Sequence, residues 1–298
     1  MRFANNLLFA GRVNNMAKPA YSIAVVAPAN RLAREAADKV AALAEAQYGD
    51  RLRLYFHPQC FLSSGHFAGT DKERSDAFLE AANDAAFDAV WFARGGYGAC
   101  RLDDALFGKL GRAAHTKTYL GYSDMGVLLG RLAREGVGTS VHGPMPTDVN
   151  REGGEAAALR SLSWLVDRDS TALEPNWRAD QPAFAFNLTV LSSMLGTQAE
   201  PDLSGAILMI EDIDEQHYRI DRTMFHVMSS ANVRRAAGVR LGRISKTPPN
   251  DPPFEKTEKE IVAYWCDRAG VAFLGDADIG HDAMNRIVPF PISRAAAS

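Results

Sequence analysis

The segment Tyr21–Pro28 has the sequence YSIAVVAP, a short apolar run that ends in a proline. A run of this kind, without polar alternation, is typical of a strand buried on both faces of a parallel sheet. Arg31–Gln47 follows directly, and its apolar residues recur at helical spacing, which predicts a helix. A strand followed by a helix is the repeating unit of a parallel sheet covered by helices.

The same alternation continues through the first half of the chain. We expect further strands at 52–56, 87–93 and 118–121, a strand that ends at 140–142, and helices at 71–85, 125–134 and 152–166. This rhythm predicts an α/β fold, with a mostly parallel N-terminal sheet and flanking helices. Ligands bind such sheets at the carboxyl ends of the strands.

The pattern changes beyond residue 166. Residues 167–182 contain two prolines and few periodic apolar positions, which is typical of a connector. After it we expect strands at 205–210, 239–244, 271–274 and 286–290, helices at 222–237 and 255–267, and a Pro-rich loop at 247–253. The predicted organisation is an N-terminal extension (1–20), an α/β domain (21–166), a linker (167–182) and a smaller C-terminal α+β domain (183–298).

Composition excludes several classes of partner. The 298 residues carry 33 Lys and Arg against 36 Asp and Glu, so no basic surface for nucleic acid or an anionic membrane is expected. The three cysteines are widely spaced, which favours neither disulfides nor a zinc knuckle. No run approaches the roughly 18 apolar residues of a membrane span, and Leu7–Ala10 is too short for a secretory signal. We expect a cytoplasmic protein whose chain starts at Met1 or Met16.

The segment Gly121–Gly126, GYSDMG, follows a predicted strand and opens a predicted helix. A serine on such a turn exposes its hydroxyl above the sheet, and the adjacent helix N-terminus offers free N–H groups to an oxyanion. The match to the Gly-x-Ser-x-Gly elbow is incomplete, because Met125 replaces the second glycine. Ser123 is thus a candidate nucleophile or a helix N-cap. Cys100 is a rival nucleophile that lacks the elbow.

A glycine-rich segment, Arg94–Gly98, follows another predicted strand end. Clustered glycines let the backbone approach a ligand and direct N–H groups toward it. The segment matches no phosphate-binding loop. It is either a tight turn or the second wall of an oxyanion hole.

A serine nucleophile needs a base and an orienting carboxylate. Position favours His142, at a strand end, and His281, in a polar loop, equally. Glu211 directly ends an apolar strand and is the candidate carboxylate. The acids of residues 211–215 also suggest a divalent metal site, but no Asp-x-Asp-x-Asp-Gly loop is present, and we predict no metal.

Taken together, these motifs resemble the LD-carboxypeptidases, or muramoyltetrapeptide carboxypeptidases, a serine peptidase family that also includes the microcin C self-immunity peptidases. The resemblance spans roughly residues 20–292 and rests on short motifs in the family's order: Arg94-Gly-Gly-Tyr-Gly98, Gly121-Tyr-Ser-Asp124, His142-Gly-Pro144, Asn187-Leu-Thr189, Glu211-Asp-Ile213 with Tyr218-Arg-Ile-Asp-Arg222, and Gly280-His281 with Pro289.

The resemblance implies that Ser123 is the nucleophile, Glu211 the acid and His281 the general base, with the backbone N–H groups of Gly96 and Asp124 as the oxyanion hole. It thereby favours His281 over His142, which becomes a structural or cleft-lining residue. It further implies a triad completed across the domain interface, usually in a homodimer, with no cofactor.

The implied substrate is the cytoplasmic murein tetrapeptide, cleaved before its terminal D-Ala during peptidoglycan recycling. A carboxypeptidase also has to bind a free carboxylate, which arginine pairs bidentately. We expect substrate contacts from Arg94, Tyr97, Arg101 and Arg219.

One departure from the family pattern is that Ala185-Phe186 replaces a Gly-Gly pair, which predicts a cleft of altered shape. Two other functions stay open: an immunity peptidase that destroys a peptide–nucleotide antibiotic, and a non-enzymatic peptide-binding module.

Overall fold

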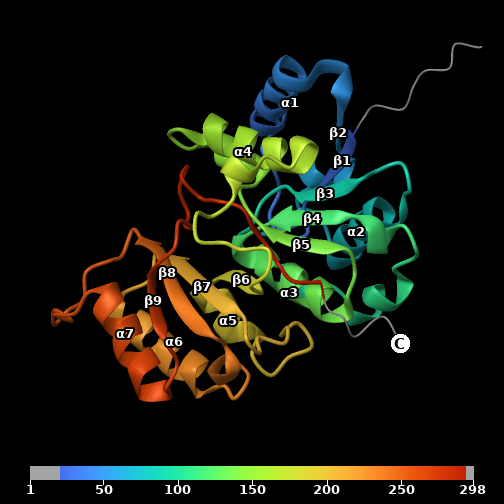
Figure 1. Ribbon diagram of the computed structural model, residues 1–298. Helices are drawn as coiled ribbons and strands as arrows, with labels where there is room; N and C mark the ends of the chain where they lie inside the picture. The colour runs from blue at the N-terminus through green and yellow to red at the C-terminus, as the bar shows by residue number, and fades with distance from the viewer. Residues whose placement is uncertain (1–20, 293–298) are drawn as a thin grey trace, which may run out of the picture.

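A six-stranded sheet forms the first half of the protein, in the order β10-β5-β4-β3-β1-β2. The computed structural model describes residues 21–292, so the expected extension and Met16 lie outside the described residues (Figure 1). All strands are parallel except β10, which pairs antiparallel with β5 at the edge. The strands are β1 (Tyr21–Val26), β2 (Leu52–Phe56), β3 (Ala89–Phe92), β4 (Thr118–Gly121), β5 (Thr139–His142) and β10 (Val288–Pro289).

Helices cover both faces of this sheet. Along β1, Ile23 and Val25 belong to one buried cluster, with α1 and α4, while Ala24 and Val26 belong to the other, with α2 and α3. Burial on both faces explains the continuous apolar run of this strand. The helices are α1 (Arg34–Tyr48), α2 (Asp71–Asn83), α3 (Gly126–Glu135) and α4 (Gly154–Asp167).

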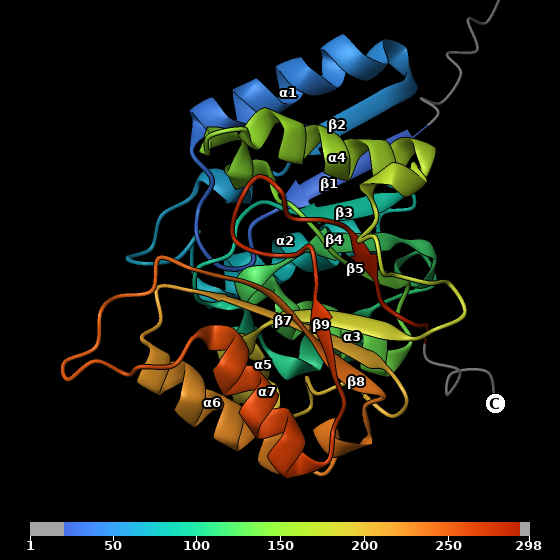
Figure 2. The ribbon, with the colours of Figure 1, turned by 60° about the vertical axis from the view of Figure 1, so that its left-hand side comes forward.

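A second sheet of four strands, in the order β6-β7-β8-β9, forms the rest of the protein. Its strands are β6 (Ala183–Asn187), β7 (Ile207–Ile213), β8 (Gly238–Ser245) and β9 (Phe273–Asp276), with helices α5 (Leu188–Met194), α6 (His217–Ser229) and α7 (Glu258–Ala269). Helices α6 and α7 pack together on the side away from the first sheet (Figure 2). All pairings in this sheet are parallel. The part expected to be α+β is therefore a second parallel sheet with alternating helices.

One buried core runs through both parts. The cluster beneath α2 and α3 continues into β6, β7 and α6 of the second sheet. The ring of Phe290, just after β10, lies 5.0 Å from that of Phe184 and 5.2 Å from that of Phe186, both in β6. The chain end thus returns to the first sheet and closes the interface between the two sheets.

The sequence predictions for the first sheet and its helices are confirmed to within a few residues. In the second part, β6 and α5 were missed, and α6 begins at His217 where a start at residue 222 was expected. Among residues 21–292, no helix combines the length and apolar character needed to cross a bilayer.

Candidate active site

Ser123 lies in the turn between β4 and α3. The buried strand ends at Gly121, and a short 3-10 helix, η6 (Ser123–Met125), leads into α3. Ser123 has a φ of 60°, a left-handed conformation that costs a residue with a side chain about 1–2 kcal/mol. A β-carbon on Gly121 would lie 2.9 Å from the Phe92 ring, so the strand end requires glycine. This is the geometry of a nucleophile elbow, which exposes the serine hydroxyl above the sheet.

The Ser123 hydroxyl does not cap a helix. Neither Tyr122, at the N-cap position of η6, nor Met125, at that of α3, makes a side-chain capping bond. Ser123 Oγ instead lies 2.9 Å from His281 Nε2. The interpretation of this serine as a helix cap is therefore wrong.

The imidazole of His281 links the two sheets. His281 lies in the loop after β9, and its Nδ1 is 2.5 Å from Oε2 of Glu211, in β7. Glu211 is fully buried, and His281 is 8% exposed. Because Ser123 follows a strand of the first sheet, the three side chains form one hydrogen-bonded row across the interface, within a single chain.

The surroundings of His281 suit it to accept a proton. Burial lowers the pKa of His281, but the charge and hydrogen bond of Glu211 raise it more, so the pKa lies above its ordinary value. The Glu211 carboxylate favours a proton on Nδ1, which leaves Nε2 free to accept from the Ser123 hydroxyl. The row can therefore remove the Ser123 proton and stabilise the imidazolium that forms.

The Gly95–Gly98 loop, after β3, packs against Ser123. A β-carbon on Gly95 would lie 2.9 Å from Ser123 Cβ and 3.0 Å from its Oγ. Gly96 has a φ of 104°, and a β-carbon there would collide with the Asn30 side chain. Within residues 21–292, the N–H of Gly96 donates to no acceptor. A free backbone N–H beside a nucleophile is the group that an oxyanion requires.

Two buried charged side chains, Arg74 and Asp124, hold this loop by bonding the peptide group between Gly98 and Ala99. Arg74, in α2 and fully buried, donates from Nη1 to the Gly98 carbonyl at 2.8 Å. The adjoining N–H, of Ala99, donates to the Asp124 carboxylate at 2.9 Å. Burial raises the pKa of Asp124 to about 6, against the opposing effects of the Ala99 bond and the Arg74 charge. Sequence reasoning missed Arg74, because an arginine in the first turn of a helix usually faces solvent.

His142 lies near the row but does not belong to it. Its side chain is 1% exposed, and its Nε2 is 3.0 Å from Oδ1 of Asn285. Burial lowers the pKa of His142 to about 4, so the imidazole is neutral near pH 7. The structure thus places His281 at the serine and His142 in a buried contact.

The residues expected to bind substrate differ in their partners. Tyr97, in the glycine-rich loop, is 49% exposed. Arg94 donates only to a backbone carbonyl, at 3.3 Å, and no carboxylate of residues 21–292 pairs with it. Arg101 pairs with Asp71 at 3.0 Å. Arg94 is therefore the arginine beside the loop that is free to bind a carboxylate.

The acidic run of the second sheet is committed to local contacts. Asp212 accepts hydrogen bonds from the side chains of Asn187, at 2.7 Å, and Thr189, at 2.9 Å. Glu215 pairs with Arg219 at 3.3 Å. Arg219, which was expected to bind substrate, therefore already has a carboxylate partner. In the described part of the chain, no group of three His, Cys, Asp or Glu side chains could hold a metal ion.

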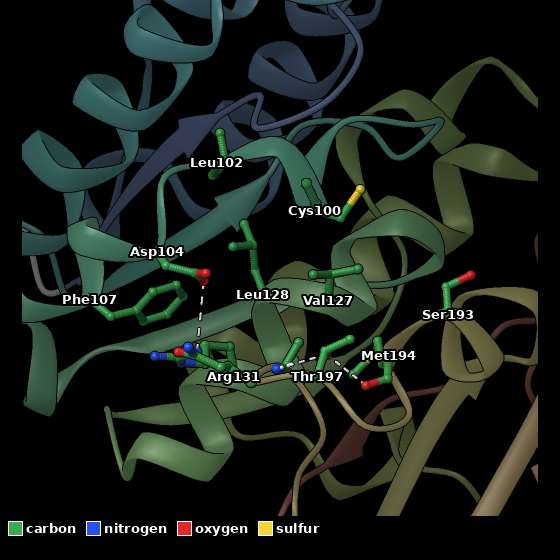
Figure 3. Close-up of a pocket in the computed structure, with 13 residues that line it drawn as sticks. Cys100, Leu102, Asp104, Phe107, Val127, Leu128, Arg131, Ser193, Met194 and Thr197 are labelled. Carbon is green, nitrogen blue, oxygen red and sulfur yellow. Dashed lines mark hydrogen bonds and ion pairs between the residues drawn. The ribbon is translucent and has the colours of Figure 1, made fainter.

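No residue of the row lines the cavity beside Cys100. The exposed side chain of Cys100 lines this cavity of about 170 Å³, between the segment after the glycine-rich loop, helix α3 and the end of α5 (Figure 3). The walls of this cavity are mainly apolar, with Leu102, Leu128 and Met194 among them, and Arg131 lies at its edge. No histidine lines the cavity, so Cys100 lacks a base there.

Ala185 and Phe186, which replace the expected glycine pair, are each 1% exposed. A β-carbon on Gly126, in α3, would lie 3.2 Å from the Phe186 ring. The replacement therefore fills the core between the two sheets. The expected change in the shape of the substrate cleft stays a prediction.

Comparison with known proteins identifies the family. The profile of the LD-carboxypeptidase N-terminal domain matches residues 23–143, and that of the LD-carboxypeptidase C-terminal domain matches residues 183–293. A murein tetrapeptide carboxypeptidase of Pseudomonas aeruginosa is 28% identical over 284 residues, which cover 90% of each chain.

Solved structures share the fold. The crystal structure of a muramoyltetrapeptide carboxypeptidase from Oxalobacter formigenes superposes with a TM-score of 0.77 and 25% identity, covering 91% of this chain and 96% of that one. The microcin C7 self-immunity protein superposes with a TM-score of 0.71 over 91% of each chain, but at 16% identity it shows the fold alone. On the two domain matches, the chain belongs to the LD-carboxypeptidase family and is a carboxypeptidase of the serine type.

Proposed function

We propose that this enzyme hydrolyses the amide bond to the terminal D-Ala of murein tetrapeptides, in the cytoplasm, through an acyl-enzyme on Ser123. The observation that carries this proposal is the hydrogen-bonded row. Ser123 Oγ lies 2.9 Å from His281 Nε2, and Glu211 lies 2.5 Å from Nδ1, beside a Gly96 N–H that donates to no acceptor within residues 21–292. The names of the relatives support the substrate class.

In the proposed reaction, His281 Nε2 removes the Ser123 proton as Oγ attacks the scissile carbonyl. The N–H groups of Gly96 and Asp124 bind the oxyanion, and loss of one such donor typically costs about 10²–10³ in turnover. His281 then gives the proton to the leaving D-Ala amine, which departs with the C–N electron pair. Water, activated by the same imidazole, hydrolyses the ester and restores Ser123.

Arg94 is the proposed partner of the free carboxylate of the substrate. It stands one residue before Gly95, which touches Ser123, and it has no acidic partner in the described residues. Arg101 and Arg219 already pair with Asp71 and Glu215. An arginine without a carboxylate partner can form the bidentate pair without first breaking another.

The Arg94 assignment can be tested with tetrapeptide and its C-terminal amide. Wild type should prefer the free acid by about 10- to 100-fold in kcat/KM, the usual effect of a charge-assisted hydrogen bond. Arg94→Met should lose this preference, because it removes the guanidinium, whose charge favours the carboxylate over the neutral amide. Arg101→Met and Arg219→Met are measured beside it. If Arg94→Met keeps the preference and another variant loses it, the carboxylate binds that other arginine.

The substrate class is tested by release of the terminal residue from three compounds. These are L-Ala-γ-D-Glu-meso-diaminopimelate-D-Ala, the same peptide ending in L-Ala, and an aminoacyl sulfamoyl nucleoside. We expect D-Ala release from the first and at least about 10²-fold slower cleavage of the others, since a misplaced scissile bond loses that much. Cleavage of the nucleoside conjugate alone would assign the enzyme to the immunity function and overturn the proposal.

We also propose that the enzyme acts as a homodimer, as the family resemblance implies. Because the row of three side chains is complete within one chain, dimerisation is not needed to assemble it. Sedimentation should give twice the mass of the chain, and a dilution that yields monomers should leave the Ser123 nucleophile reactive.

A further inference from the structure

The loop that carries His281 is anchored to the first part of the chain by three side chains. Arg160, in α4, donates to the carbonyls of Ala283 at 2.8 Å and Asn285 at 2.9 Å. His142, in β5, bonds the Asn285 side chain. Arg151, just after the 3-10 helix η7 (Pro146–Asn150), donates from Nη1 to the carbonyl of His281 itself. Of these contacts, only the one from Arg151 reaches the backbone of His281, whose imidazole bonds Ser123.

Arg151 is itself held by a buried carboxylate. Asp148, in η7, is 1% exposed, and its Oδ1 accepts from Arg151 Nε at 2.9 Å and from the Tyr122 hydroxyl at 2.9 Å. Arg151 Nη2 is also 3.3 Å from that hydroxyl. Tyr122 directly precedes Ser123, and its ring lies 4.9 Å from the His281 ring. These contacts thus form a continuous hydrogen-bond network from Tyr122, in the nucleophile turn, through Asp148 and Arg151 to His281.

We propose that Arg151 is a positioning residue for this reaction: its guanidinium, braced by Asp148 and Tyr122, fixes the His281 backbone so that the imidazole meets Ser123 across the domain interface. This inference rests on the proposed function, in which His281 is the base. Because the His281 carbonyl accepts a charge-assisted hydrogen bond from Arg151, the His281 backbone cannot shift along the interface without breaking that bond.

The charge of Arg151 also affects the pKa of His281. The Arg151 cation disfavours the imidazolium and lowers the pKa of His281, whereas Glu211 and Asp148 raise it. The other polar groups that face His281 or flank it are Ser123, Tyr122, His142 and Asp282, the last paired with Arg243. Removal of Arg151 should therefore let His281 take a proton at higher pH, and an enzyme whose base is protonated is inactive.

Arg160 provides a matched control. Both arginines donate to carbonyls of the same loop, and both are partly buried. Arg160, however, bonds residues two and four positions beyond His281. If Arg151 acted only by holding the loop in place, Arg151→Met and Arg160→Met should have the same effects on activity, pH dependence and thermal unfolding.

The test compares wild type, Arg151→Met, Arg151→Lys and Arg160→Met in three measurements. They are the pH profile of kcat/KM for tetrapeptide, the NMR titration of the His281 ring without substrate, and the rate of Ser123 phosphonylation by a fluorophosphonate. Phosphonylation needs the activated serine but no murein peptide. If the tetrapeptide assignment fails, the titration and the phosphonylation profile still test Arg151.

Arg151→Met should lose about 10- to 100-fold in kcat/KM and in phosphonylation, and its acid limb and His281 titration should move to higher pH. Arg151→Lys should keep the wild-type titration, because it keeps the charge, yet recover only part of the rate, since an ammonium lacks the planar fork. The Arg151→Lys variant also keeps the test possible if Arg151→Met does not fold. Arg160→Met should titrate as wild type. Wild-type rates in Arg151→Met, or a rate loss and a titration shift of equal size in Arg160→Met, would overturn the proposal, and an unshifted titration in Arg151→Met would remove the charge effect.

Discussion

At the scale of single residues, Ser123 combines a strained backbone with close packing. Its φ of 60° is held between β4, which ends at Gly121, and α3. On the other side, Gly95 approaches so closely that a β-carbon would lie 3.0 Å from the serine Oγ. A serine in such a frame has little freedom to leave its hydrogen bond to His281. The position of the hydroxyl therefore depends on neighbours that have no side chain.

We predict that Gly95→Ala lowers kcat by about 10²-fold. The added methyl would push Ser123 Oγ out of its hydrogen bond with the general base, His281. The matched control is Gly108→Ala, where a β-carbon meets no atom within 4 Å. Steady-state D-Ala release measures both variants, and circular dichroism checks folding. Equal activity in the two variants would show that the approach of Gly95 to Ser123 has no catalytic importance.

Local motifs made Ser123 and Glu211 candidates, because a strand-to-helix turn and a strand end are visible in the sequence, but their roles came from the family resemblance. The choice between His142 and His281 needed the family resemblance, since both stand in similar local patterns. Arg74 and Arg151 could not be predicted. Each acts on a backbone carbonyl far along the chain, Gly98 or His281, and such pairing leaves no local pattern.

At the scale of secondary-structure elements, β6 and β10 join the two sheets. β10 pairs with β5, and the Phe290 ring that follows it contacts both phenylalanines of β6. Phe290 is 4% exposed. These contacts bury aromatic surface between the sheet that carries Ser123 and the sheet that carries Glu211. The interface is therefore part of the folding core.

Phe290→Ala should lower the free energy of unfolding by about 3–5 kcal/mol, the usual effect of removing a buried phenylalanine ring. Ile292→Ala is the control, because Ile292 is 65% exposed and should change stability by no more than about 0.5 kcal/mol. Urea denaturation measures both. A small effect for Phe290→Ala would mean that the β6–β10 contact is not part of the stable core.

The errors in the predicted elements have local causes. β6 was overlooked because its five residues directly follow the connector expected at 167–182. The start of α6 was misplaced because Gln216 makes no side-chain capping bond. The capping box at Thr257 and Glu260 does mark the start of α7, which lies three residues after the predicted start. A capping side chain therefore helps to locate a helix start, but it does not fix the predicted boundary to the residue.

At the scale of the whole molecule, the site exists only where the two sheets meet. Ser123 comes from the first sheet, and Glu211 comes from the second. The His281 loop is bonded to both, through Glu211 and through Arg151. Because the interface is part of the core that the two sheets share, conditions that loosen it should disassemble the row of side chains as the core unfolds.

The burial of His142 should make stability fall in acid, because burial lowers the pKa of His142 more than the hydrogen bond to Asn285 raises it. The folded-state pKa of about 4 lies below the ordinary value of 6.5. The contribution of His142 is thus fully present above pH 6.5 and is lost as the pH falls through 4. The shift corresponds to about 3 kcal/mol of unfolding free energy.

His142→Gln should remove this term, since glutamine can still donate to Asn285 but does not titrate. The measurement is urea denaturation of both proteins between pH 7.5 and 4. Wild type should be the more stable at pH 7.5, and its advantage should shrink by about 3 kcal/mol by pH 4. A difference that stays constant with pH would mean that His142 titrates normally in the folded protein.

The central claim, that Ser123 is the nucleophile of an L,D-carboxypeptidase, is tested most directly by D-Ala release from the murein tetrapeptide by wild type and Ser123→Ala. We expect wild type to release D-Ala and the folded Ser123→Ala variant to lose at least about 10⁴-fold in the rate of release, because the remaining groups cannot form the acyl-enzyme. Release at the wild-type rate by Ser123→Ala would contradict the account and return attention to Cys100.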